Sequence, residues 1–288
     1  GTYARGQMNV RGDFSAHEIA MDYPLFAASG LASRGTYVLD NHGLEVPDFR
    51  AQAFAGDITG SVSVRFKGLA FRAETRMRGV NLAEVLDAFD RPDFPVNSLN
   101  WAAGVSANTV ETWKADFKQF EISGDAHWTE PDQIPAGRLP AAGDFSFRYR
   151  HEPRELQLNS GEIITPASHI TFNGRLSAEN SALETHFESG DLSTWNAFFH
   201  AIQRVASREH APTRNIAGRA RWDVRILGPL LGPTFIGHAR GEAVHYGSLL
   251  CDLVEGDISY APEELSITHG LARRGATLAE IEAHLDLW

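Results

Sequence analysis

Alternation of apolar and polar residues runs through most of this chain and constrains its fold more than any other feature. Ile58, Val62, Val64 and Phe66 share one parity, and Ser61, Ser63 and Arg65 fill the other. A period of two is typical of a strand with one apolar and one wetted face. Strands with such faces usually form antiparallel sheets. The pattern therefore predicts an all-β, mainly antiparallel fold.

The same alternation recurs along the chain, and we expect its apolar residues to line one common face. Gly and Pro punctuate these segments at short intervals, which predicts hairpins that meander in chain order. Roughly twenty strands, stacked about 4.8 Å apart, would make a body about 90 Å long. The further residues expected on the lined face are Phe71, Met77, Phe145, Phe147, Ile170, Phe172, Trp222, Val224 and Ile226.

Two short amphipathic helices are expected to interrupt the strands. Asn81 is a candidate N-cap for the first, with Glu84 completing a capping box, and Asp191 is a candidate N-cap for the second. Each helix has one apolar stripe. Two roles stay open for the stripes: they pack on the sheet, or they form a plug or lid at the edge of a groove. The stripe residues are Leu82, Val85, Leu86 and Phe89, and then Trp195, Phe198, Phe199 and Ile202.

An internal repeat is indicated because both helices follow an alternating strand and a glycine. Residues 76–82 resemble residues 187–192, and matching strands upstream give a period of about 110 residues, longer than familiar solenoid units. We therefore expect one continuous β-groove segment of a larger protein over residues 1–288. Its expected subdivisions are a partial repeat (1–34), two repeats (35–142 and 143–233) and a second partial repeat (234–288).

Charge and motif content exclude several function classes. A net charge of −11 argues against a nucleic-acid surface. Cys251 is the single cysteine, so neither an intrachain disulfide nor a thiolate metal cluster can form. The twelve histidines lack zinc spacing, and no phosphate-loop, nucleophile-elbow or dinucleotide motif occurs. We expect no enzyme activity, cofactor or metal, although acidic pairs such as Glu280 and Glu282 keep a glycan-acting enzyme as an alternative.

The apolar face itself is the candidate functional surface. The sheet could close as a dry sandwich or barrel, or it could curl incompletely and leave an apolar trough. An open trough would be an unusually large exposed apolar patch, and such patches mark a ligand or partner site. Acyl chains would fill it well, because each buried methylene contributes about 0.8 kcal/mol without directional bonds.

The chain resembles the AsmA/TamB family of bridge-like lipid-transfer proteins. The recurrent motif is a strand, a turn of glycine and a polar residue, and then a second strand along which inward-facing residues alternate. The segments that carry the likeness are 35–39, 44–49, 55–60, 169–176, 241–258, 265–267 and 283–287.

The resemblance implies a taco-like β-groove, an inner-membrane anchor and passage of phospholipid between the inner and outer membranes. The implied partners are a phospholipid or other acyl-chain ligand and an outer-membrane β-barrel protein; the implied location is the periplasm. No catalytic residue is implied. Since the sequence has no signal peptide and no run of about 18 apolar residues, we expect the anchor and the membrane contact in a segment outside this chain. The alternative is a closed β scaffold that assists assembly or secretion of outer-membrane β-proteins through its sheet edges.

Overall fold

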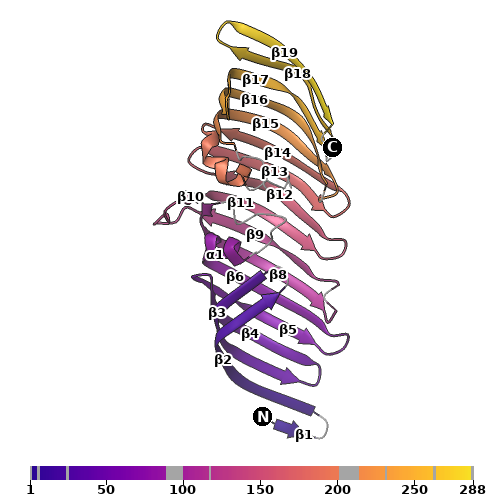
Figure 1. Ribbon diagram of the computed structural model, residues 1–288. Coiled ribbons are helices and arrows are strands. Elements are labelled where there is room, and N and C mark those ends of the chain that lie inside the picture. The colour runs from indigo at the N-terminus through magenta and orange to yellow at the C-terminus, as the bar shows by residue number, and fades with distance from the viewer. Residues whose placement is uncertain are drawn as a thin grey trace.

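The computed structural model describes residues 2–4, 7–23, 26–88, 100–116, 118–200, 214–230, 232–261 and 264–286. It contains one long, open and curved sheet of seventeen strands (Figure 1), which confirms the all-β prediction. The strands of this sheet are β1 (Thr2–Ala4), β2 (Gln7–Tyr23), β3 (Phe26–Asp40), β4 (Gly43–Ala53), β5 (Gly56–Arg65), β6 (Ala70–Asn81), β8 (Gly104–Lys114), β9 (Glu121–Thr129), β11 (Ala142–Arg150), β12 (Glu155–Ile164), β13 (Ser168–Ser177), β14 (Ser181–Ser189), β15 (Ile216–Gly228), β16 (Thr234–Tyr246), β17 (Leu249–Ala261), β18 (Glu264–Arg274) and β19 (Thr277–Asp286).

The sheet is a meander in which each strand pairs antiparallel with the next one along the chain. The two termini therefore lie at opposite ends of the molecule (Figure 1). Seventeen strands spaced about 4.8 Å apart give a sheet roughly 75 Å long. The sheet has fewer strands and is shorter than the sequence pattern predicted, because individual strands are long. Strand β2 alone takes up 17 residues.

Local sequence explains how the hairpins close and how the sheet bends. Between β3 and β4, the Asp40 carboxylate accepts hydrogen bonds from the backbone N–H groups of His42 (2.7 Å) and Gly43 (2.8 Å), an Asx turn. These two bonds lower the pKa of Asp40. β-Bulges with a positive φ angle shift the register in four strands, and such bulges increase the local bend and twist. Their residues are Glu18 in β2, Ser160 in β12, Ala243 in β16 and His269 in β18.

Two short helices lie against the sheet, as the sequence predicted. Helix α1 (Leu82–Ala88) follows β6, and Asn81 caps it by accepting a hydrogen bond from the Ala83 N–H at 3.0 Å. Glu84 reaches back to the Asn81 side chain rather than to its backbone N–H. Helix η2 (Leu192–Trp195) follows β14 and continues as helix over residues 196–200. Asp191 caps it by accepting from the Ser193 N–H at 2.8 Å.

A cluster of buried apolar side chains lies under these helices. It combines Leu82 from α1, Trp101 from the short strand β7 (Trp101–Ala102), and Ile163 from β12. Strand β7 pairs in parallel with β10 (Leu139–Pro140), outside the main sheet. Each side chain of this size contributes about 1.5–3 kcal/mol when fully buried. Among the described residues, no helix has the length and apolar character needed to cross a membrane.

Candidate functional site

One face of the seventeen-stranded sheet carries the apolar parity of nearly every strand, and we call it the apolar face. Directly opposed residues of neighbouring antiparallel strands point to the same side of a sheet. Register joins Leu44, Val64, Phe71 and Trp113 in one row across β4, β5, β6 and β8. A second row joins Phe187 of β14 to neighbours in β13 and β15. The rows form one continuous surface from strand to strand.

Twelve of the thirteen residues predicted to line a groove have register positions on the apolar face. Each of the twelve is half-buried, neither core nor freely exposed. Five lie in the N-terminal half of the sheet and seven in the C-terminal half. They are Ile58, Val62, Val64, Phe71, Met77, Phe145, Phe147, Ile170, Phe172, Trp222, Val224 and Ile226.

Phe66 is the exception, because it lies outside the strands and has no register position on the apolar face. Strand β5 ends at Arg65, and Phe66 opens the turn to β6, where its side chain is 41% exposed. The chain reverses here through Gly68, whose φ of 83° suits glycine. The Phe66 N–H donates to the carbonyl of His42 at 2.9 Å, which fixes it in the turn.

Further residues lie on the apolar face beyond the thirteen predicted to line a groove, and the same period of two identifies them. They fill the rows between the predicted positions. They include Phe14, Phe49, Trp113, Tyr149, Leu158, Phe187, Phe235 and Tyr260.

Aromatic side chains on the apolar face contact one another across strands. Phe71 stacks on Trp113 with ring centroids 5.3 Å apart. The ring of Phe172 lies over Gly161 of the neighbouring strand, where an added Cβ would come within 2.0 Å of it. The absence of a side chain at Gly161 lets Phe172 approach Phe145, two strands away, to 6.0 Å. The face is therefore a packed aromatic and aliphatic surface rather than a set of isolated side chains.

The helices cover part of the apolar face near one end of its strands. Leu82 is 5% exposed there, and Leu86 and Trp195 pack against the same cluster. The Trp195 Nε1–H donates to the Ser168 Oγ at 2.9 Å, which ties the second helix to β13. Val85, Phe198 and Phe199 are half-buried, while Phe89 and Ile202 lie outside the described residues.

The rest of the apolar face has less cover than a protein core. The solvent-accessible surface of the chain is 18013 Å². A compact monomer of 31.6 kDa would expose about 12,000 Å², so this chain exposes about half as much again. Phe187, beneath the helix residue Trp195, is 2% exposed, whereas the aromatic residues Phe71, Phe145 and Phe147 are only half-buried. Together these values describe a sheet whose apolar side is incompletely covered.

One charged side chain, Glu111, interrupts the apolar face in the described residues of β4 to β15. It lies in a row with Ala73 and Ile122. Its Oε1 accepts hydrogen bonds from the hydroxyls of Thr109 (2.5 Å) and Thr75 (3.2 Å). Its Oε2 is buried and has no hydrogen-bond partner among the residues that the structure describes. Leaving a buried acceptor unpaired costs about 1–3 kcal/mol, so this residue is a destabilising feature of the face.

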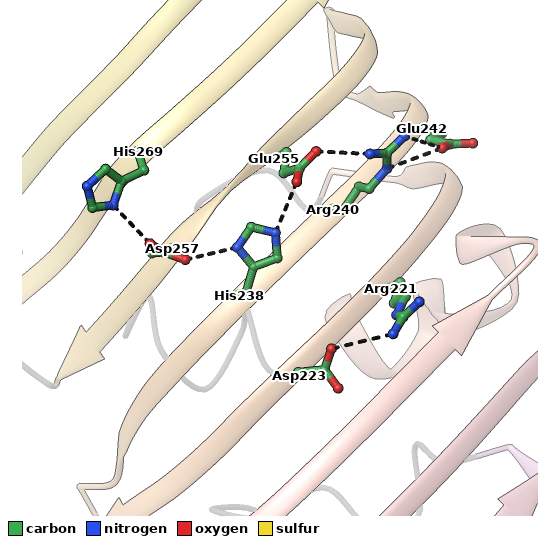
Figure 2. Close-up of polar contacts among 8 residues, drawn as sticks. All are labelled: Arg221, Asp223, His238, Arg240, Glu242, Glu255, Asp257 and His269. Atoms are coloured by element: carbon green, nitrogen blue, oxygen red, sulfur yellow. Dashed lines mark hydrogen bonds and ion pairs between the residues drawn. The ribbon is translucent and has the colours of Figure 1, made fainter.

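The opposite face, which we call the polar face, carries cross-strand networks of histidine, arginine and carboxylate. Figure 2 shows the network on β16, β17 and β18. His238 Nδ1 is 2.9 Å from Asp257 Oδ1, and His269 Nδ1 is 3.0 Å from Asp257 Oδ2. The hydrogen bond to Asp257, aided by one to Glu255, raises the pKa of His238. The bonds from His238 and His269 lower the pKa of Asp257.

Arg240 completes this network by joining two carboxylates. Its guanidinium lies 3.0 Å from Glu242 and 3.1 Å from Glu255 (Figure 2). The hydrogen bond to Glu242 is the main cause of the raised pKa of Arg240. Despite this density of ligand-type side chains, the described part of the chain contains no group of three or more that could hold a metal ion.

Comparison with protein-family models, curated proteins and solved structures gives no match for this chain. The resemblance to the AsmA/TamB family therefore stays a prediction from the sequence.

Proposed function

We propose that this chain is a periplasmic segment of an AsmA/TamB-like protein, and that its apolar face is a taco-like groove for lipid. In this proposal the groove is a passive conduit for phospholipid acyl chains between the inner and outer membranes and contributes to outer-membrane biogenesis. The tandem repeats extend the groove, and an anchor in the inner membrane lies outside the chain. The observation that carries the proposal is the incomplete cover of a continuous apolar face.

The extent of the face argues that it has an occupant. Water in contact with apolar surface costs about 25 cal/mol per Å², and contiguous exposed patches on monomers rarely exceed a few hundred Å². A row such as Leu44, Val64, Phe71 and Trp113 is one of many along a sheet roughly 75 Å long. A protein with such a face stays in solution when an apolar ligand covers the face and removes it from water.

Acyl chains suit the chemistry of the face better than a folded partner does. A protein partner would bring polar backbone groups that need hydrogen bonds, and the apolar face offers few. Hydrocarbon needs none, and about ten buried methylenes would contribute about 8 kcal/mol. Glycines such as Gly124 and Gly174 lie among the larger apolar side chains of the face. Headgroups would stay at the wet rim while the tails slide.

A fluorescent phospholipid or fatty-acid probe tests the proposal. The wild-type chain should bind the probe, and an aspartate at Val62 or Phe172 should weaken binding strongly, because a carboxylate resists burial against hydrocarbon. The matched controls are Ser63→Asp and Asn173→Asp, which place the same charge on the polar face of the same strands. These controls should bind the probe as the wild type does.

Lipid extraction of the purified protein, followed by mass spectrometry, would identify the natural occupant. The proposal fails if the wild-type chain neither carries lipid nor binds the probe. It also fails if Ser63→Asp reduces binding as much as Val62→Asp does, since binding would then not depend on the apolar face.

The second candidate function is a scaffold that assists assembly or secretion of outer-membrane β-proteins. The observation that favours it is the position of β19, which hydrogen-bonds to β18 and forms one end of the sheet (Figure 1). An end strand offers a template to which a strand of another β-protein can add. A closed scaffold would not bind the lipid probe, and the Val62→Asp substitution would unfold the protein.

A further inference from the structure

Four arginines gather on the polar face at the N-terminal end of the sheet. Arg34 of β3 lies directly opposite Arg50 of β4. Arg50 in turn lies opposite Thr59, which lies opposite Arg76 of β6. Arg78 occupies the next position of β6 on the same face. Like charges directly opposite each other destabilise a sheet, so this arrangement needs a compensating interaction.

Several arginines elsewhere on the polar face have carboxylate partners, although Arg65 and Arg225 form no ion pair among the described residues. Arg72 pairs with Glu74 at 2.8 Å, and Arg148 pairs with Glu121 at 2.9 Å. Arg240 likewise contacts two glutamates. Acidic residues are plentiful, because the chain has 37 of them against 26 basic ones. An arginine left without an ion pair is therefore not explained by a shortage of acids.

Within the described residues, no ion pair involves any of the four clustered arginines. Arg76 donates its Nε–H to the Asn108 amide oxygen at 3.0 Å, a neutral partner. Asp57 lies opposite Arg78 in the register and forms no ion pair with it. The four guanidinium groups therefore keep unused donors on an exposed surface.

A depression of about 630 Å³ opens between these side chains, a size typical of small-molecule sites. One carboxylate and one imidazole join the guanidinium groups around it, so positive charge prevails. Guanidinium groups bind phosphate and related oxyanions through paired N–H donors. The charged and titratable lining residues are His17, Arg34, Arg50, Asp57, Arg76 and Arg78.

We propose that this depression, the arginine site, binds a phosphate-type oxyanion that neutralises Arg34, Arg50, Arg76 and Arg78. The anion is a phosphate group, either free in solution or in a lipid headgroup. The site lies on the opposite side of the sheet from the apolar face and does not depend on lipid passage there.

Inorganic pyrophosphate and two kinds of vesicle are the probes. The vesicles contain phosphatidylcholine alone or phosphatidylcholine mixed with phosphatidylglycerol. The test variant combines Arg34→Gln, Arg50→Gln and Arg78→Gln. The control combines Arg72→Gln, Arg148→Gln and Arg240→Gln, which removes the same charge from paired arginines of the same face. Calorimetric titration of pyrophosphate and vesicle flotation are measured for all three proteins.

The wild type and the control should bind pyrophosphate, and the test variant should bind it about tenfold or more weakly. Without anion, the test variant should unfold at the same or a higher temperature than the wild type, because it lacks the Arg34–Arg50 repulsion; this shows that it is folded. Binding to phosphatidylglycerol vesicles alone, lost in the test variant only, would support a lipid headgroup as the source. The proposal is overturned if the wild type binds neither probe, or if the test and control variants lose binding equally.

Discussion

Truncating two phenylalanines on the same face tests whether the apolar face is open. Phe187 is 2% exposed, stacks on Trp222 at 3.9 Å and meets Trp195 edge-on at 5.3 Å. Phe147 is half-buried and contacts Phe145 at 6.1 Å. Both side chains lie on the apolar face, but only Phe187 is covered by a helix. The comparison of Phe187→Ala with Phe147→Ala therefore isolates the effect of cover.

The expected losses differ by a factor of two or more. Phe187→Ala should lower the free energy of unfolding by about 4 kcal/mol, as for a fully buried phenylalanine, with two aromatic contacts contributing about 0.5–1.5 kcal/mol each to that loss. Phe147→Ala should cost about 1–2 kcal/mol, because part of its side chain is already in contact with solvent. No large cavity forms at an open face, so the cavity penalty is also absent there.

Urea unfolding followed by far-ultraviolet circular dichroism measures both losses. Equal losses would refute the reasoning, because Phe147 would then be covered as completely as Phe187 and the apolar face would be closed. Adding a saturating acyl-chain ligand supplies a second comparison. The ligand should stabilise the wild type more than the Phe147→Ala variant, because the ligand covers the Phe147 ring and the variant lacks that ring.

Three further predictions concern the polar face, a helix cap and a glycine. The raised pKa of His238 means that its bond to Asp257 stabilises the fold below about pH 6.5 and is lost as the pH rises through the raised value; the lowered pKa of Asp257 preserves this bond down to acid pH. His238→Gln should therefore flatten the fall of the unfolding temperature as the pH rises above about 6.5. Asn81→Ala removes the cap of α1 and should lower the free energy of unfolding by about 1 kcal/mol in urea titrations. Gly161→Ala places a Cβ 2.0 Å from the Phe172 ring, so it should cost about 1–3 kcal/mol and weaken binding of the lipid probe.

Each of these three predictions has a control variant and an outcome that would contradict it. His245→Gln is the control for the pH profile, and an unchanged profile in His238→Gln would contradict the first prediction. Asp191→Ala should cost about as much as Asn81→Ala, and no loss in either would mean that the caps are not formed. Gly190→Ala meets its nearest atom at 3.8 Å, so a loss there equal to that of Gly161→Ala would contradict the steric explanation.

Residue parity was enough to assign most of the apolar face. Val62, Val64 and Phe71 alternate with polar residues, and in a strand that pattern leaves only one way to bury them. The caps of the helices were also local: Asn81 and Asp191 each satisfy a backbone N–H within the same turn. Parity did not show that the strand ends before Phe66, because the same alternation continues into a turn where Gly68 reverses the chain.

Parity misleads wherever a bulge inserts one residue. Leu44 and Val46 point to the apolar face, and so does Phe49, because the register of β4 shifts between Val46 and Phe49. Without that shift Arg50 would point to the apolar face instead of joining Arg34 on the polar face. The arginine site therefore could not be derived from the alternation alone.

The sequence by itself determined that this chain is a meander of two-faced strands with two short capped helices, because alternation, turn residues and caps act within a few residues. Only the tertiary structure decided that Leu82, Trp101 and Ile163 meet under the helices while Phe147 stays only half-buried. It alone also decided which arginines oppose each other. These outcomes depend on register, bulges and sheet curvature, which are set by contacts between strands and not by the composition of any one strand.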